Sequence, residues 1–388
     1  MLLSCSALTR APFVKASVAH KLIIIVIQLL MLTACGGPVE PAADEPWYGS
    51  GSETMSATHP DMKWERVLAA APWGERAMPR GGLLDGQFYV IAGRAGAFTI
   101  YGDTWRSPDG VQWEMMSDDP GWEKRAYPEI EFVQGNIILT GGQSLATFYN
   151  DVWRSADKGK TWELMNGDAP WDVRAGHHTA VVGDDIYLYG GARNSFGRIF
   201  YPELWVSSDQ GASWELRSQL PEDMGRAGMQ VVEIDGTIYF MGGDHDNPVF
   251  VANWEGRRND VWKSDDEGAT WELLGNAPWK PRTGQQCVAA DAKVFCIGGH
   301  LRGPLEETAQ YLAHDLWMWD PKASGESMDG WQLVNNQVWG CPATNESCGK
   351  SDFLMVIRDN KIWTLGGDRE VASPWPQDND VWSAEIPN

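Results

Sequence analysis

Basic residues are scarce in this chain of 388 residues. It contains 31 Lys and Arg against 53 Asp and Glu, which gives a formal net charge of −22 at pH 7. Because phosphate binding needs a concentrated basic surface, this balance argues against nucleic acid as a partner. Long apolar runs are missing too: Leu22–Met31 is too short to span a bilayer comfortably. No long stretch shows helical periodicity, which argues against a helical bundle.

The N-terminus has the features of an export signal. Three basic residues precede the apolar run Leu22–Met31, which has the length of a signal-peptide core. Residues 32–36, Leu-Thr-Ala-Cys-Gly, resemble the lipobox of bacterial lipoproteins. The resemblance implies cleavage before Cys35 and attachment of a lipid to its thiol, and Gly36 favours the outer membrane by analogy. An ordinary secretory signal with an incidental cysteine is the alternative.

These features divide the chain into three parts. We expect a signal peptide in residues 1–34, a lipidated cysteine and flexible tether in residues 35–60, and a folded domain in residues 61–388. The tether is rich in Gly, Pro, Ala, Glu and Ser and has little to bury. The expected location is the bacterial outer membrane, through the lipid anchor, or the periplasm or cell surface.

Four cysteines follow the lipidated one, an even number in an oxidising compartment. If a two-residue hairpin loop begins at Asp291, Cys287 and Cys296 lie directly opposite each other at a non-hydrogen-bonded site, which predicts a cross-strand disulfide. Cys341 and Cys348 bracket a short loop and are the natural second bridge. A metal site, the alternative, lacks nearby ligands at sensible spacing, and we expect neither a metal nor a cofactor.

One unit recurs six times after the tether. Each copy has a short strand that begins with Trp, and these tryptophans are about 49 to 60 residues apart: Trp64, Trp113, Trp162, Trp214, Trp271 and Trp331. A second strand, rich in β-branched and aromatic residues, ends in a glycine pair or its remnant: residues 92–93, 141–142, 190–191, 242–243, 298–299 and 366–367. A third strand carries an acid two residues before a tryptophan: Trp105, Trp153, Trp205, Trp262, Trp317 and Trp382.

This concurrence of three landmarks resembles the kelch repeat, which the galactose-oxidase-like propellers also carry. The resemblance covers residues 64–386 and implies an all-β, six-bladed β-propeller around a channel, with four strands per blade. The last unit has no Trp strand after Trp382, whereas the strand at Trp64 has no blade of its own. We therefore expect the N-terminal strand to complete the last blade and close the ring.

A second pattern, S-x-D-x-G-x-x-W, occurs within the same repeated units. It occurs at residues 155–162, 207–214 and 264–271, with a shortened copy at residues 107–113. It resembles the Asp box of sialidases and many other propellers. The residue types make it a turn device, because Asp caps backbone N–H groups and Gly supplies a positive φ. The box by itself does not make the chain a sialidase.

A repeated phrase, Ala-Pro-Trp-x-x-Arg, places an arginine before most inner strands. Five arginines entering the ring could converge on the channel mouth and bind a carboxylate, sulfate or phosphate. The alternative is structural: each arginine bonds carbonyls or acids of the blades, and each tryptophan fills a wedge between them. Repetition favours this alternative, because scaffold needs repeat and ligand contacts usually do not. The residues are Arg76, Arg125, Arg174, Arg226 and Arg282.

The loops after the glycine pairs are unequal in length and content, and they face the same side as the arginines. Variable loops on a rigid scaffold commonly carry recognition. The candidates that we select from them are His245, His300, Arg369 and Trp375. For any single residue, a solvated loop is the alternative.

These features predict a monomeric, lipid-anchored binding module for a glycan or a protein. The alternative is a carbohydrate-active enzyme, mutarotase-like or sialidase-like, which needs paired carboxylates at the mouth, with Asp246, Glu306, Glu307 and Glu370 as candidates. No motif selects a catalytic residue, and the sequence leaves enzymatic activity open. A third hypothesis is a part in assembly of outer-membrane machinery.

Overall fold

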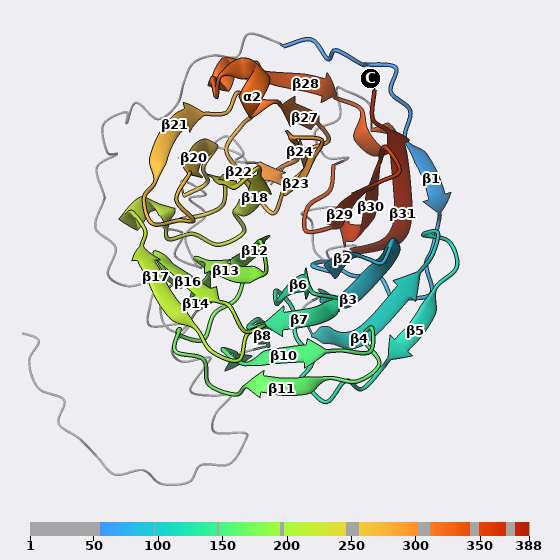
Figure 1. The fold of residues 1–388 in the computed structure, drawn as a ribbon. Coiled ribbons are helices and arrows are strands. Elements are labelled where there is room, and N and C mark those ends of the chain that lie inside the picture. Colours follow the sequence, from blue (N-terminus) through green and yellow to red (C-terminus); the bar gives the residue numbers. More distant parts are fainter. Residues whose placement is uncertain are drawn as a thin grey trace, which may run out of the picture. The chain divides into compact units, whose positions relative to one another are not determined.

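Six antiparallel sheets of four strands each stand in a ring (Figure 1). The computed structural model describes residues 55–96, 98–145, 147–194, 198–245, 256–301, 311–341, 349–369 and 377–387. The predicted signal peptide, Cys35 and most of the predicted tether lie outside these residues. In the described ranges, no helix has the length and hydropathy needed to cross a bilayer.

The first three sheets each use four strands in chain order, from the centre of the ring to its rim. Sheet 1 has β2 (Arg80–Leu84), β3 (Gln87–Ala95), β4 (Thr99–Ser107) and β5 (Glu114–Ser117). Sheet 2 has β6 (Glu129–Val133), β7 (Asn136–Thr140), β10 (Val152–Ser155) and β11 (Glu163–Asn166). Sheet 3 has β12 (His178–Val182), β13 (Asp185–Tyr189), β16 (Glu203–Ser207) and β17 (Glu215–Gln219).

The other three sheets repeat this order, except that the last borrows its rim strand. Sheet 4 has β18 (Gln230–Ile234), β19 (Thr237–Met241), β20 (Asp260–Ser264) and β21 (Glu272–Asn276). Sheet 5 has β23 (Gln286–Ala290), β24 (Lys293–Ile297), β27 (Leu316–Trp319) and β28 (Trp331–Asn335). Sheet 6 has β29 (Leu354–Arg358), β30 (Lys361–Asp368), β31 (Gln377–Glu385) and β1 (Glu65–Leu68).

Short strands and helical turns lie in the connections between the main strands. Small strands follow several glycine pairs: β8 (Gln143–Ser144), β9 (Thr147–Phe148), β14 (Ala192–Asn194), β15 (Arg198–Phe200), β22 (Arg282–Thr283), β25 (His300–Leu301) and β26 (Tyr311–Leu312). The described helical turns are α2 (Pro321–Ser324) and the 3₁₀ turns Glu222–Met224, Met328–Gly330 and Val338–Gly340.

The predicted ring closure is confirmed. Strand β1 pairs with β31 in antiparallel register, with Glu65 opposite Ser383, so the N-terminal strand completes sheet 6. The protein is therefore a six-bladed β-propeller. The chain contacts the propeller before β1 begins, since the N–H groups of Thr58 and His59, inside the expected tether, each donate a 2.8 Å hydrogen bond to β28 of sheet 5.

Local turn chemistry explains how each inner strand returns as the second strand. In four sheets a two-residue turn begins with an aspartate in the left-handed region, with φ between 49° and 54°, and the next residue also has positive φ. Turns with two such residues match the right-handed twist of the flanking strands. The four aspartates are Asp85, Asp235, Asp291 and Asp359.

The core is divided into clusters that lie between neighbouring sheets. In one of them, Ile91 of sheet 1 packs against Ile130 and Leu139 of sheet 2. The tryptophan of the repeated phrase fills the same wedges. Its ring meets the rim-strand tryptophan edge-on, with centroids 5.8–6.0 Å apart, which is a favoured geometry for aromatic pairs. The pairs are Trp73–Trp113, Trp122–Trp162, Trp171–Trp214 and Trp279–Trp331.

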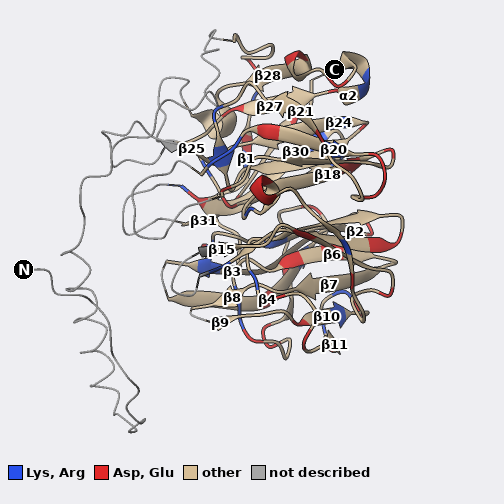
Figure 2. Cartoon of the chain, turned by 90° about the vertical axis from the view of Figure 1, so that its left-hand side faces the viewer, with Lys and Arg blue, Asp and Glu red and all other residues tan. Residues whose placement is uncertain are grey.

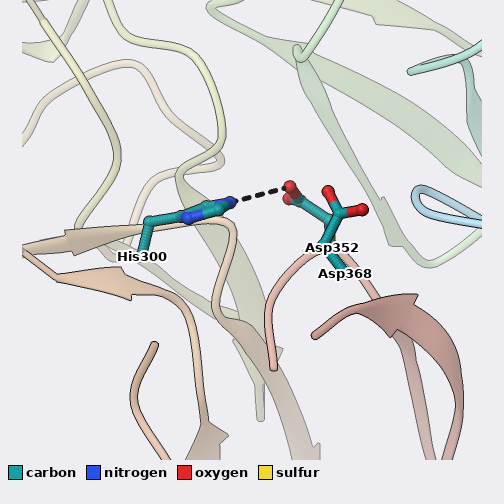
Figure 3. A group of neighbouring side chains, drawn as sticks. All are labelled: His300, Asp352 and Asp368. Atoms are coloured by element: carbon teal, nitrogen blue, oxygen red, sulfur yellow. Dashed lines mark hydrogen bonds and ion pairs between the residues drawn. The ribbon is translucent and has the colours of Figure 1, made fainter. Parts of the chain in front are cut away.

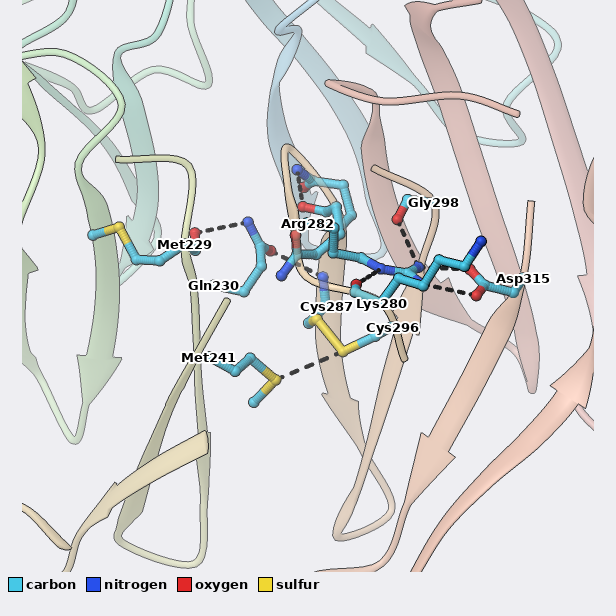
Figure 4. Close-up of a disulfide and its surroundings, with 11 residues drawn as sticks. Met229, Gln230, Met241, Lys280, Arg282, Cys287, Cys296, Gly298 and Asp315 are labelled. Atoms are coloured by element: carbon cyan, nitrogen blue, oxygen red, sulfur yellow. Dashed lines mark hydrogen bonds and ion pairs between the residues drawn. A yellow bond between two sulfur atoms is a disulfide. The ribbon is translucent and has the colours of Figure 1, made fainter. Parts of the chain in front are cut away.

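The cross-strand disulfide is confirmed (Figure 4). Its register follows from the Asp291 turn, which places Cys287 opposite Cys296 with their Cα atoms 4.2 Å apart, as in a non-hydrogen-bonded pair. Cys341 also takes part in a disulfide, and Cys348, its expected partner, lies outside the described residues.

Charged residues are spread over the blades. Figure 2 shows acidic positions on several sheets and in turns, rather than gathered at one place. Many of them have local partners. Asp157, in a turn of the S-x-D-x-G-x-x-W pattern, accepts a 2.9 Å hydrogen bond from the N–H of Thr161, and the Ser155 hydroxyl accepts one of 2.8 Å from Gly159. Asp157 and Ser155 thus stabilise this turn.

Candidate binding site at the centre of the ring

Six residues with positive φ, one before each inner strand, surround the centre of the propeller. Their φ values lie between 56° and 66°, and five backbone N–H···O=C bonds of 2.6–3.4 Å link them head to tail. We call them the central ring: Met78, Tyr127, Gly176, Gly228, Gly284 and Asp352. This is where the sequence places the channel mouth.

The central ring is asymmetric. Blades 3, 4 and 5 use glycine, which adopts positive φ without strain, whereas the adjacent blades 6, 1 and 2 use Asp352, Met78 and Tyr127. A non-glycine residue at such a position costs of order 1–3 kcal/mol, and sites of this kind cluster where function requires a particular side chain. The asymmetry therefore directs attention to the side of the ring formed by blades 6, 1 and 2.

A second set of side chains surrounds the central ring. Each belongs to the residue directly after a glycine pair, whose backbone forms a β-bridge to the residue before the central-ring position. Unlike the strands, this position does not repeat its chemistry from blade to blade. Its residues are Arg94, Gln143, Ala192, Asp244, His300 and Asp368.

His300, Asp352 and Asp368 come together from blades 5 and 6 (Figure 3). The Nε2 atom of His300 lies 3.2 Å from a carboxylate oxygen of Asp352 and 2.7 Å from the hydroxyl oxygen of Ser351. One nitrogen or oxygen atom from each member of the trio lies within 4.8 Å of the other two. Both carboxylates are more than nine-tenths buried, with side chains 8% and 4% exposed, and His300 is 18% exposed.

Neighbouring residues hold Asp368 in place from two sides. Arg94 of blade 1 donates to one of its oxygens at 3.3 Å, and Gln377 of β31 donates to the other at 2.7 Å. Tyr127 lies beside the Arg94–Asp368 pair, with the Arg94 guanidinium carbon 5.9 Å from the centroid of the Tyr127 ring. We call Arg94, Tyr127, His300, Asp352 and Asp368 the central cluster.

The environment changes the acidity of three members of the central cluster. Burial, with the nearby charge of Asp352, raises the pKa of Asp368, although Arg94 acts in the opposite direction. Burial also raises the pKa of the Tyr127 phenol, again against the effect of Arg94. Tyr127 and the two carboxylates raise the pKa of the Arg94 guanidinium, which keeps it charged although burial opposes this. The cluster thus combines a permanent cation, a neutral donor and two buried carboxylates, of which Asp368 holds a proton more readily than an ordinary aspartate.

The five arginines predicted as anion ligands bind acids of their own blades, as the structural alternative expects. Their side chains are 0–4% exposed, and each guanidinium pairs with the acid of its own blade's third strand at 2.5–2.7 Å. Each also donates to the carbonyl of the first residue of the glycine pair at 2.9–3.0 Å. A guanidinium that is buried and saturated by its own blade is not open to a ligand. The pairs are Arg76–Asp103, Arg125–Asp151, Arg174–Glu203, Arg226–Asp260 and Arg282–Asp315.

The sixth blade has the same device in another form, which sequence reasoning missed. Lys350, 1% exposed, lies 2.5 Å from Asp380 and 2.8 Å from Asp378, and its carbonyl accepts from the Gly299 N–H as the arginine carbonyls do in other blades. Its separation of 30 residues from Asp380 falls within the 26 to 34 residues of the arginine pairs. That spacing is the signal that would have identified it.

The four binding candidates selected from the loops lie in different surroundings. His300 belongs to the central cluster, whereas the Nδ1 atom of His245 bonds the Gly225 carbonyl at 2.7 Å. Arg369 pairs with Asp378 at 2.5 Å and Asp380 at 3.2 Å, although its side chain stays 40% exposed. Trp375 lies outside the described residues, as do the proposed acids Asp246, Glu306, Glu307 and Glu370.

Sequence reasoning did not select Arg94, Tyr127, Asp352 or Asp368. The usable signal is positional. Once the six units are aligned on their glycine pairs, the residue after each pair belongs to the second set of side chains, which surrounds the central ring. The residue two after each repeated Arg belongs to the central ring itself. Polar or aromatic residues at such positions, where other blades have glycine or alanine, break the repeat.

Comparisons with known proteins bear on the fold alone. No family model matches the sequence, and no curated protein matches it. A solved structure titled "Structure of YjhT" superposes with a TM-score of 0.61, over 81% of this chain and 96% of that one. The two sequences are 16% identical, so the likeness supports the propeller architecture and transfers no activity.

Proposed function

We propose that this chain is a lipid-anchored extracytoplasmic binding module that takes a glycan at the central cluster. The observation that carries this proposal is the loss of repetition at the centre of a repetitive fold. Structural devices such as the arginine–acid pairs recur in every blade, whereas the central cluster occurs once. A feature that the scaffold does not need six times is best explained by a ligand.

The chemistry of the central cluster suits a ligand rich in hydroxyl groups. Asp352 and Asp368 accept hydrogen bonds, Arg94 donates them, and His300 and Tyr127 do either. Hydrogen bonds to charged groups contribute about 1.5–3 kcal/mol each when buried, so a few hydroxyls give useful affinity. Buried carboxylates also disfavour an anionic ligand, which directs the proposal to neutral or amino sugars rather than acidic ones.

The binding test uses the full mature chain in detergent on a glycan array, followed by calorimetric titration of the strongest hit. Asp352→Asn and Arg94→Gln should each weaken binding by roughly tenfold or more, because each loses a charged hydrogen-bond partner. Gln143→Ala is the matched control, since Gln143 has the same position in blade 2 outside the central cluster. No binding to any glycan, or equal affinity in all variants, would refute the proposal.

The lipid anchor is tested separately. Mass spectrometry of the chain purified from a bacterial membrane fraction should find a mature N-terminus at Cys35 carrying acyl chains. Cys35→Ser should leave the protein in the soluble fraction. An unmodified Cys35, or a mature N-terminus elsewhere, would contradict the anchor and leave an ordinary secretory signal.

A second function, sugar acid–base catalysis, has one observation in its favour. Asp352 and Asp368 are the paired carboxylates that such an enzyme needs, and the raised pKa of Asp368 suits a group that exchanges protons. Exchange of sugar anomers, followed by NMR, should be faster with the protein than without it and should be lost in Asp368→Asn. Binding without turnover would leave the binding module as the function.

A further inference from the structure

Charge pairing inside this propeller follows a rule with one exception. Each of the six blades pairs the acid of its third strand with a buried arginine or lysine. Asp368 likewise has Arg94. Asp352 is 8% exposed, but its only ion-pair partner among the described residues is His300, which is charged only when protonated. A buried carboxylate without a permanent cation is costly, so this place has one positive charge too few.

The two oxygens of Asp352 have different surroundings. The contact with His300 involves Oδ2, whereas Oδ1 lies next to Gly284. Gly284, with φ of 66°, leaves room for Oδ1, because a Cβ there would lie 2.4 Å from it. The carboxylate of Asp352 therefore fits between His300 and the central-ring backbone of blade 5.

The geometry points to a divalent metal ion as the missing charge: we propose that His300, Asp352 and Asp368 bind one. An imidazole nitrogen and two carboxylate oxygens that converge within 4.8 Å form a ligand set suited to Mn²⁺, Fe²⁺ or Zn²⁺. Three protein ligands leave positions open for water or for the hydroxyls of a ligand.

The surroundings of the three side chains fit this role. Gln377 and Arg94 each donate to a different oxygen of Asp368, and ligating carboxylates are commonly oriented by such hydrogen bonds. His300 presents Nε2 to the carboxylates, and the Ser351 hydroxyl that bonds this nitrogen turns aside when the ion binds. The metal site does not depend on the proposed glycan binding.

The test uses the untagged full chain, stripped with a chelator and titrated calorimetrically with Mn²⁺, Zn²⁺ or Ca²⁺ alone. One ion per chain should bind, and the melting temperature should rise with it. His300→Gln and Asp352→Asn should each weaken binding at least about tenfold, while Asp235→Asn, an exposed acid elsewhere, should not. Circular dichroism confirms that each variant is folded, and two separate ligand variants guard against the loss of one.

Spectroscopy distinguishes Mn²⁺ bound through His300 from Mn²⁺ bound non-specifically to other acidic residues of the chain. Bound Mn²⁺ should show nitrogen coupling in pulsed electron paramagnetic resonance, and His300→Gln should abolish it. No binding tighter than about 1 mM, or wild-type affinity in both ligand variants, would overturn the site. Metal binding without any glycan hit would support the metal site and refute the proposed function. Glycan binding without metal binding would refute the metal site and support the proposed function.

Discussion

The arginine–acid pairs should be the strongest single contributors to stability, and Arg226→Ala tests this most sharply. Arg226 is fully buried and donates to both oxygens of Asp260, at 2.5 and 2.6 Å. It also donates to the carbonyls of Gly242 at 3.0 Å and Asp223 at 2.5 Å. Burial tends to raise the pKa of Asp260, but the guanidinium more than offsets this and keeps it below its usual value.

The expected loss follows from what the substitution leaves behind. Without Arg226, a carboxylate 8% exposed loses its bidentate ion-pair partner, and two carbonyls lose this donor. Removing one partner of a buried pair costs about 3–5 kcal/mol, mainly because the other charge stays buried. In a domain of this size that corresponds to a fall in melting temperature of roughly 5 °C.

The assay is urea unfolding followed by tryptophan fluorescence, with Arg217→Ala as the matched control. Arg217 is an arginine on the rim strand of blade 3, 36% exposed, and it lies 3.7 Å from an oxygen of the exposed Glu267. Its loss should cost less than about 1 kcal/mol. Equal effects of the two substitutions would refute the structural role of the buried pairs.

Three further changes have defined outcomes. Cys287→Ser should lower the free energy of unfolding by roughly 2–3 kcal/mol in non-reducing urea melts, because the disulfide closes a short loop; an unchanged midpoint would contradict this. Gly284→Ala should cost about 1–3 kcal/mol in the same assay, since its φ of 66° and the contact with Asp352 both oppose a Cβ. Burial raises the pKa of Glu131 to about 7, so the folded state binds its proton more tightly than the unfolded chain. The free energy of unfolding should therefore fall as pH rises from about 4.5 to 7, and Glu131→Gln should reduce that slope; an identical slope would refute the assignment.

The scaffold was predictable because its signals repeat. The rim tryptophans, glycine pairs and third-strand acids each mark one place in a blade, so six copies correct one another. Ring closure by the strand at Glu65 followed from counting strands. The Cys287–Cys296 bridge followed from the register that a two-residue turn imposes.

The roles at the centre were harder to predict, for two physical reasons. Arg76 and its counterparts precede the inner strands, but sequence does not reveal whether a guanidinium reaches into the ring or folds back on its own blade. Asp103 and its equivalents were noted only as part of a strand motif, although they are the partners that decide this. The buried pairs agree with the structural alternative that repetition favoured.

The central cluster is hidden because it depends on what differs between blades. Asp352 lies before an inner strand and Asp368 after a glycine pair, 16 residues apart, and His300 comes from the preceding blade. Without the backbone ring, no spacing rule connects them. Tyr127 and Arg94 are brought to the same place by two further blades.

Whether this non-repeating cluster holds the ligand is tested most directly by a crystal structure of the chain with its strongest glycan hit. The expected result places sugar hydroxyls within hydrogen-bond distance of Asp352, Asp368 and Arg94. A sugar bound on the rim strands or on loops away from the central ring, with these side chains unoccupied, would contradict the assignment of the site.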